Sequence, residues 1–468
     1  MASTIFFDGF GPWGGEHIGE IDPLFWEKTS NVSLSEYRTD RSYSVINGTS
    51  NGLDFMGYTF GAVVKLNSHT QDADCAYLKA KNFPNSFSAG DTAFGLGFFI
   101  NKLCTDSVAR PNNNSGSNYA SKFLLLQTTV GNNPVDVLKF EAIHIAPTGY
   151  VGIVNPETGI KISQYNSSSY EDMGTFTFNV WGAPWYTEQN SNTVSSLYQR
   201  TINAYDYKYG GLYVEVCVTP DQDPNDVTKP YAVQIKINGM NLTKYGTTTD
   251  KKIYLKNNFN TGSKFFDSAT FYGSRIPASG GANPLQYGGN NNTYMYDTYL
   301  DNIYVIGGTS DQDCFLGPTT KIFNIAPITG STVNSNSSWQ AFNLAWNTNT
   351  SIEDSLKDSN GDKSYVYTET SGAVLAVDMA NIPSDPNYAI GGIKITNSVR
   401  KSNKNTSFVN VWGTGSNPSG MNNIGNNFTV NNNQYEYKNQ YLLQNPVTNN
   451  PWTFTDINDG KFGIKKTS

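Results

Sequence analysis

Short runs in which apolar and polar residues alternate recur along almost the whole chain. Examples are the runs at 58–66, 231–237 and 299–306. A period of two matches the alternating side chains of a β-strand and excludes an amphipathic helix at these places. Asn, Gly and Pro, which favour turns, separate the runs. No period of 20–50 residues repeats, so the pattern predicts many short strands stacked in layers rather than a propeller or solenoid.

Composition agrees with an all-β chain. The 468 residues include 29 Tyr and 26 Phe, whereas charged residues make up only 15%, below the usual ~25% of globular chains. Aromatic residues favour strands, and a coiled coil or collagen-like fibre needs a different composition. Only two short helices are expected, at 350–357, where Ser351-Ile-Glu353 follows Thr350 with capping-box spacing, and at 455–458.

Charge and hydropathy limit the kinds of partner that the chain is expected to bind. The net charge is −7, and the densest basic spot inside the chain is Arg400-Lys401, so nucleic acid is not an expected partner. The longest apolar stretch, at 94–100, is far shorter than the ~20 residues of a membrane-spanning helix, so no membrane insertion is expected. Residues 1–8 lack the pattern of a secretory signal, which predicts synthesis in the cytoplasm of the producing cell.

The four cysteines do not form a recognisable framework. Cys75, Cys104, Cys217 and Cys314 are widely separated, and no pair has zinc-finger or CxxC spacing. Cys217 lies within a predicted strand, where a free Cys usually serves as a small apolar side chain. We therefore expect four reduced thiols.

The chain is predicted to divide into two domains. Residues 1–320 form a large β-sandwich with long loops and an insertion near 155–210. Residues 321–468 form a smaller C-terminal β domain. Asn238-Gly239 is a strong signal for a tight hairpin turn, and the Asn-rich stretch 422–433 is expected to be a loop tip.

The sequence offers little support for a catalytic site. The three histidines, His17, His69 and His144, lie near no recognisable nucleophile motif. Glycosidases of sandwich folds place two carboxylates on one strand, so that both point into a groove. Glu20-Ile-Asp22 is the nearest phrase, but Pro23 follows it, and Glu141 is expected to stand alone on its strand.

Ligand-binding candidates are few. The acidic loops 221–226 and 311–313 could offer oxygen atoms to calcium, but neither has the spacing of a calcium loop, so solvated turns are favoured. We expect no catalytic residue, no metal site and no cofactor. Trp181, Trp185 and Tyr186 fall within the expected insertion and are the candidate contact residues. They would bind either a glycan, by stacking, or a neighbouring subunit.

Several phrases in a fixed order resemble the concanavalin-like (laminin-G-like) jelly-roll module of bacteriophage virion proteins. The phrases are Asp8-Gly-Phe10, Leu24-Phe-Trp26, LYVEVCV at 212–218, VQIKINGMNL at 233–242, LDNIYVI at 300–306 and the exit phrase GGTSDQDCFLGPTTKIFNIAP at 307–327. The second domain continues the resemblance with IGGIKITNSVRKSNKNTS at 390–407 and PWTFTDINDGKFGIK at 451–465.

The resemblance implies a non-enzymatic structural protein, exposed on the head, neck or tail of a phage particle. Its expected partners are other virion proteins and copies of itself, with a host surface glycan as a further partner. A carbohydrate-binding adhesin or receptor-binding tail-fibre protein is the alternative. A polysaccharide hydrolase is the third reading.

Overall fold

The computed structural model describes two compact units, which divide the chain between residues 322 and 323. The sequence boundary was placed at 320/321. The described residues are 3–9, 25–28, 32–36, 62–66, 76–81, 83, 91–100, 120–130, 133–145, 157–166, 168–178, 212–237, 239–256, 266–273, 298–308, 314–317, 320, 322, 325–328, 330, 332–343, 351–357, 364–401 and 405–468.

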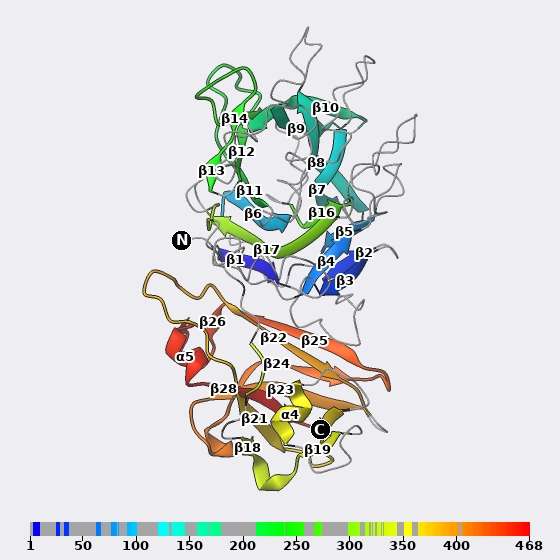
Figure 1. The fold of residues 1–468 in the computed structure, drawn as a ribbon, viewed down its shortest axis with the longest axis vertical. Coiled ribbons are helices and arrows are strands. Elements are labelled where there is room, and N and C mark those ends of the chain that lie inside the picture. The colour runs from blue at the N-terminus through cyan, green and yellow to red at the C-terminus, as the bar shows by residue number, and fades with distance from the viewer. Residues whose placement is uncertain are drawn as a thin grey trace, which may run out of the picture. The chain divides into compact units, whose positions relative to one another are not determined.

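A nine-stranded antiparallel sheet forms one layer of the first unit (Figure 1). Its strands are β1 (Ser3–Asp8), β3 (Val32–Glu36), β4 (Ala62–Leu66), β6 (Ala93–Ile100), β11 (Leu212–Thr219), β12 (Tyr231–Ile237), β13 (Met240–Asn241), β15 (Ile253–Leu255) and β17 (Thr298–Gly308). The order is β13-β12-β11-β6-β17-β4-β3, with β1 paired to β17 and β15 paired to β12. The first and last strands of the unit are therefore neighbours.

An eight-stranded antiparallel sheet forms the second layer of this unit. Its strands are β2 (Trp26–Lys28), β5 (Tyr77–Ala80), β7 (Ala120–Val130), β8 (Asn133–Ile145), β9 (Glu157–Tyr165), β10 (Tyr170–Phe178), β14 (Thr243–Lys244) and β16 (Ser268–Tyr272). The order is β14-β10-β9-β8-β7-β16-β5-β2, so β7 and β8 occupy the centre of the sheet.

Large aromatic side chains from the two sheets meet between the layers. The ring centroids of Phe98 and Phe271 are 5.1 Å apart and those of Phe6 and Trp26 are 5.3 Å apart, both edge-to-face. Buried aromatic side chains of this size contribute strongly to a hydrophobic core. The predicted fold class, an all-β jelly-roll sandwich followed by a smaller β unit, is confirmed.

The region expected as an insertion begins with two regular strands. β9 pairs with β8 from Ile145↔Glu157 to Leu138↔Gln164, and β10 pairs with β9. Ile160, Ile162 and Phe176 are fully buried, so residues 157–178 belong to the sandwich and are not an added segment. Polar residues on the opposite face of these strands diluted the apolar pattern in the sequence. Residues 179–211 lie outside the described residues.

The second unit is built on a five-stranded sheet with the order β18-β21-β28-β23-β24. Its strands and those of the small sheets beside it are β18 (Val333–Asn334), β19 (Gln340–Asn343), β20 (Ser364–Tyr367), β21 (Val374–Asp378), β22 (Ile393–Val399), β23 (Thr406–Gly413), β24 (Asn422–Val430), β25 (Glu436–Leu442), β26 (Gln444–Asn445), β27 (Asn450–Pro451) and β28 (Lys461–Lys466). A cluster that includes Trp412, Trp452 and Phe462 forms part of its core.

Both predicted helices and the predicted hairpin are present. The helices are α4 (Ile352–Lys357) and α5 (Phe454–Asn458). β12 and β13 pair as the predicted hairpin, with Ile237 opposite Met240 and Gly239 at a φ of 81°. Within the described part of the chain, no helix is long and apolar enough to cross a membrane.

The Asn-rich stretch at 422–433 was wrongly expected to be a loop tip. Residues 422–430 form β24, an edge strand that pairs with β23 from Trp412↔Asn422 to Thr406↔Val430. Ile424 and Val430 are fully buried, whereas most of the other side chains are exposed. An edge strand needs few apolar residues, because one partner strand and two buried side chains hold it in place.

Candidate functional site

The three contact residues expected from the sequence, Trp181, Trp185 and Tyr186, lie outside the described residues. Several residues weighed for chemistry do so as well: His17, His69, Glu20, Asp22, Cys75, Cys104, Asp311 and Asp313. His144 lies in β8, opposite Thr158 of β9.

A row of half-buried tyrosines marks the outer face of the eight-stranded sheet. In β8, Leu138 and Phe140 are fully buried in the core. Lys139 and Glu141 alternate with them and therefore point to the other face. The register places Lys122 of β7 and Lys161 of β9 opposite Glu141. We call the outer surface around Tyr77, Tyr165, Tyr170 and Tyr272 the tyrosine face.

The tyrosines form two cross-strand pairs. Tyr77 of β5 lies opposite Tyr272 of β16, with ring centroids 6.2 Å apart. Tyr165 of β9 lies opposite Tyr170 of β10, with centroids 5.4 Å apart. Aromatic cross-strand pairs stabilise a sheet and fix the orientation of both rings. The tyrosine face is thus a preformed surface.

Lysine side chains lie over two of these rings. The Lys122 ammonium is 3.7 Å from the centroid of Tyr272, and the Lys139 ammonium is 4.5 Å from that of Tyr170. Both distances are within the range of a cation–π interaction. Positive charge therefore accompanies the aromatic rings on this face.

Asp136 of β8 connects the two halves of the tyrosine face. Its carboxylate accepts a hydrogen bond of 2.6 Å from the Tyr170 hydroxyl and one of 2.8 Å from the Gln127 amide. Gln127 in turn accepts a hydrogen bond of 3.1 Å from Thr270. Burial, followed by the hydrogen bond to Asp136, raises the pKa of Tyr170. Burial and the negative charge of Asp136 also raise the pKa of Tyr272, so both hydroxyls stay protonated at neutral pH.

Glu141 does not stand alone on its strand, as the sequence analysis expected. β8 begins at Asn133 rather than near 137, so Asp136 lies on the same strand, with a bulge near Leu138 in the pairing with β7. Glu141 forms an ion pair with Lys139 at 3.0 Å. Each carboxylate is already engaged with donors from its own sheet.

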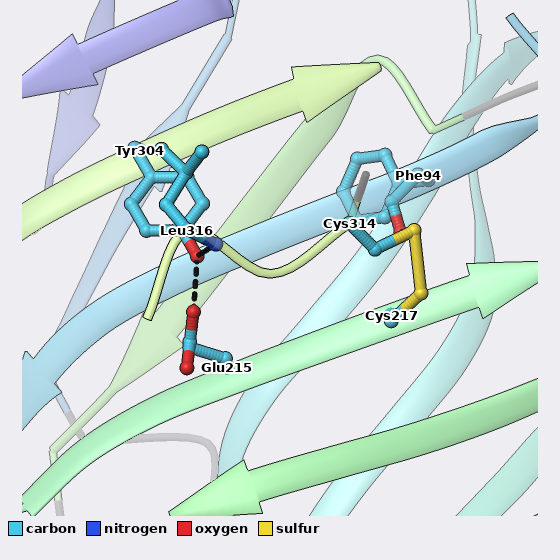
Figure 2. The surroundings of a disulfide bond; sticks show 6 residues. All are labelled: Phe94, Glu215, Cys217, Tyr304, Cys314 and Leu316. Atoms are coloured by element: carbon cyan, nitrogen blue, oxygen red, sulfur yellow. Dashed lines mark hydrogen bonds between the residues drawn. A yellow bond between two sulfur atoms is a disulfide. The ribbon is translucent and has the colours of Figure 1, made fainter. Parts of the chain in front are cut away.

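A different arrangement covers the outer face of the nine-stranded sheet. Residues 314–317, which we call the strap, cross β6 (Figure 2). The Tyr304 hydroxyl donates a hydrogen bond of 2.6 Å to Glu215 Oε1 and accepts one of 3.2 Å from the Leu316 N–H. The Gly317 N–H donates to the same Glu215 oxygen at 2.8 Å. Glu215 is fully buried and acts here as an acceptor for the strap.

Two glycines of β6 allow this close approach. A Cβ at Gly95 would lie 2.2 Å from the carbonyl oxygen of Cys314, and a Cβ at Gly97 would lie 2.1 Å from the Tyr304 ring. Any side chain at either position would displace the segment above it. The close approach of the strap and of the Tyr304 ring therefore requires glycine at these two positions of the strand.

The expectation of four reduced thiols is wrong for two of them, because Cys217 and Cys314 form a disulfide with a Cα–Cα distance of 5.4 Å. Cys217 lies on the outer face of β11, directly opposite Gly95. The strap brings Cys314 over this point, 97 residues later in the chain. Such a pairing depends on the strand register, which cysteine spacing does not reveal.

The acidic loop at 221–226 is closed by lysines. Lys229 lies 3.9 Å from Asp223 and 3.4 Å from Asp226, and Lys252 pairs with Asp221. Among the described residues, no group of three or more His, Cys, Asp or Glu side chains could hold a metal ion.

Comparisons with known proteins give weak structural similarity. No protein-family profile and no curated protein sequence matches the chain. The CBM2 module of the evolved Dit of Lactobacillus casei BL23 phage J-1 has a TM-score of 0.29 and 9% identity, over 66% of this chain and 97% of that one. Porphyranase B from Zobellia galactanivorans has a TM-score of 0.29 and 8% identity, over 65% and 93%.

The binding domain of Botulinum neurotoxin DC, solved in complex with rat synaptotagmin II, has a TM-score of 0.31 and 13% identity, over 92% of this chain and 73% of that one. At such identities and scores, none of these similarities carries a residue role or an activity to this chain.

Proposed function

We propose that this chain is a non-enzymatic carbohydrate-binding protein that uses the tyrosine face to hold a glycan. The observation that carries the proposal is the two cross-strand tyrosine pairs, Tyr77–Tyr272 and Tyr165–Tyr170, set among lysine and carboxylate groups. The sequence favours a structural role, with carbohydrate binding as the alternative. The geometry of the eight-stranded sheet reverses that preference.

Sugars suit a surface of this composition. A sugar ring offers apolar C–H faces to aromatic rings and hydroxyl groups to charged or amide side chains. Tyr gives a large and rigid contact area at a low cost in conformational entropy. The hydrogen bonds of Asp136 and the cation–π contacts already hold the rings, so binding a ligand would order few further groups.

The engaged carboxylates support the non-enzymatic part of the proposal. A glycosidase needs one carboxylic acid that donates a proton to the leaving group. Asp136 accepts two hydrogen bonds and Glu141 pairs with an ammonium group, so both carboxylates are already occupied by partners within the sheet.

The experiment is a glycan-array screen of the whole chain, followed by titration of each bound glycan. We expect Tyr272→Ala to weaken binding about tenfold or more, since buried aromatic contacts often dominate an interface. Tyr388→Ala, at an exposed tyrosine of the second unit, is the matched control and should bind like the wild type. An array without a bound glycan, or equal affinity of Tyr272→Ala and the wild type, would reject the proposal.

A second candidate is the structural virion role, in which partners are other virion proteins and copies of the chain. It is favoured by the exit phrase at 307–327, whose residues 314–317 are the strap that seals one face of a rigid sandwich. The structural candidate requires the protein to be part of a phage particle, whereas carbohydrate binding alone does not. Labelling the chain in purified particles and counting its copies would distinguish the two candidates. A structural module should occur at a high copy number fixed by the particle's symmetry.

A further inference from the structure

The strap is held at two points by different chemistry. At Cys314 the attachment is covalent, through the disulfide to Cys217. At Leu316 and Gly317 it consists of two N–H groups that donate to Tyr304 and Glu215. Figure 2 shows the two attachments at different points along β11, the neighbour of β6 that carries both Cys217 and Glu215. The covalent one depends on redox conditions, and the hydrogen-bonded one does not.

A polar atom beneath the strap depends on it for burial. Glu215 Oε2 is buried and has no hydrogen-bond partner among the described residues. An unpaired buried polar group costs free energy unless water reaches it. Opening the strap would let water reach this buried oxygen, which favours the open state. When the disulfide is absent, only the hydrogen bonds of the strap oppose opening.

Both sulfur atoms become inaccessible once the bond has formed. Cys217 and Cys314 are fully buried, and Ala93 and the half-buried Phe315 pack around them. Reduction requires an attacking thiolate to reach a sulfur atom in line with the bond. The closed strap leaves no room for this approach, so opening must precede reduction.

We propose that the strap is a latch that oxidation closes and that burial then protects from reduction. The oxidant is a small disulfide such as oxidised glutathione. The thiolate of one Cys attacks it and releases one small thiol, and the second Cys thiolate attacks the mixed disulfide and releases the other. Two thiols and one small disulfide thus give the protein disulfide and two small thiols, with no net loss of electrons. Closure fixes residues 314–317 over β6.

Hydrogen exchange of the whole chain tests the latch. The oxidised protein is compared with protein that has been unfolded, reduced and refolded in the presence of a reductant. In the reduced form, the amides of Leu316 and Gly317 are expected to exchange about tenfold faster or more, because one of two attachments is lost. In the reduced form, the amides of Val216 and Ile235 in the sheet below should remain better protected than those of Leu316 and Gly317, because they exchange only when the sheet itself opens. Cys314→Ser without reductant should reproduce the reduced form.

Two results would overturn the proposal. Equal exchange of Leu316 and Gly317 in both forms would mean that the hydrogen bonds hold the strap alone. Equal protection of the strap amides and of Val216 and Ile235 in the reduced form would mean that the strap opens only together with the sheet and is not a latch.

Reduced glutathione tests the protection on the wild-type sequence, with peptide mapping to distinguish this disulfide from Cys75 and Cys104. We expect the bond to open at least about a hundredfold more slowly under native conditions than in urea. Comparable rates in the two conditions would show that the closed strap does not shield the sulfur atoms.

Discussion

Glu215 is a carboxylate whose burial raises its pKa, while hydrogen bonds from Tyr304 and Gly317 lower it less than burial raises it. The sequence shows a lone acid in a strand and gives no sign of what covers it. Its partners, Tyr304 and Gly317, come from residues about 90 and 100 positions later, so only the folded register brings them together. The partners of Asp136, which are Gln127 and Tyr170, are likewise brought to it only by the strand register.

Replacement of Glu215 by Gln is expected to change how stability depends on pH. Because the folded pKa lies above the unfolded value, Glu215 contributes stability that is fully present below the unfolded pKa and is lost as pH rises through the folded pKa. The free energy of unfolding of the wild type relative to Glu215→Gln should therefore fall as the pH rises above about 4, the ordinary pKa of a Glu carboxyl. Urea unfolding at several pH values measures this difference. Parallel profiles of the two proteins would contradict the assignment.

At the scale of elements, strands with a clear period of two could be predicted from the sequence, as could the Asn238-Gly239 turn and both helices. β9, β16 and β24 could not, because polar residues make up much of each of these short sequences. The tyrosine face could not be predicted for a different reason. Its members come from four strands and share a face only through pairing, whereas Trp181 and Trp185 lie close together in the sequence.

Helix α5 offers a test of local sequence signals. Thr453 accepts a hydrogen bond from the Asp456 N–H, and the Asp456 side chain accepts one from the Thr453 N–H. Thr453→Ala should lower the free energy of unfolding by about 1 kcal/mol, the usual cost of losing such a cap. Thr455→Ala, at an exposed position of the same helix, is the control and should be close to neutral. Equal effects of both changes in urea unfolding would exclude the cap as a source of stability.

At the scale of the whole molecule, we propose that the two compact units are separate folding domains, with the boundary near the predicted 320/321. The disulfide lies entirely within the first unit and closes a loop with a sequence separation of 97 residues. A loop of this size gives a chain-entropy stabilisation of roughly 4–5 kcal/mol. The two units should therefore respond differently to reduction.

Thermal unfolding should show two transitions. Opening the disulfide is expected to lower the first unit's transition by several degrees or more, while that of the second unit stays in place. Calorimetry of the oxidised and reduced whole chain measures both. A single transition, or an equal shift of both, would contradict the division into domains.

The most direct test of carbohydrate binding is a crystal structure of the chain with an oligosaccharide identified on the array. The account predicts sugar density over the tyrosine face, in contact with Tyr272 or Tyr170 and within hydrogen-bond distance of Lys122, Lys139 or Glu141. Sugar bound only elsewhere on the chain, with this face empty, would contradict it.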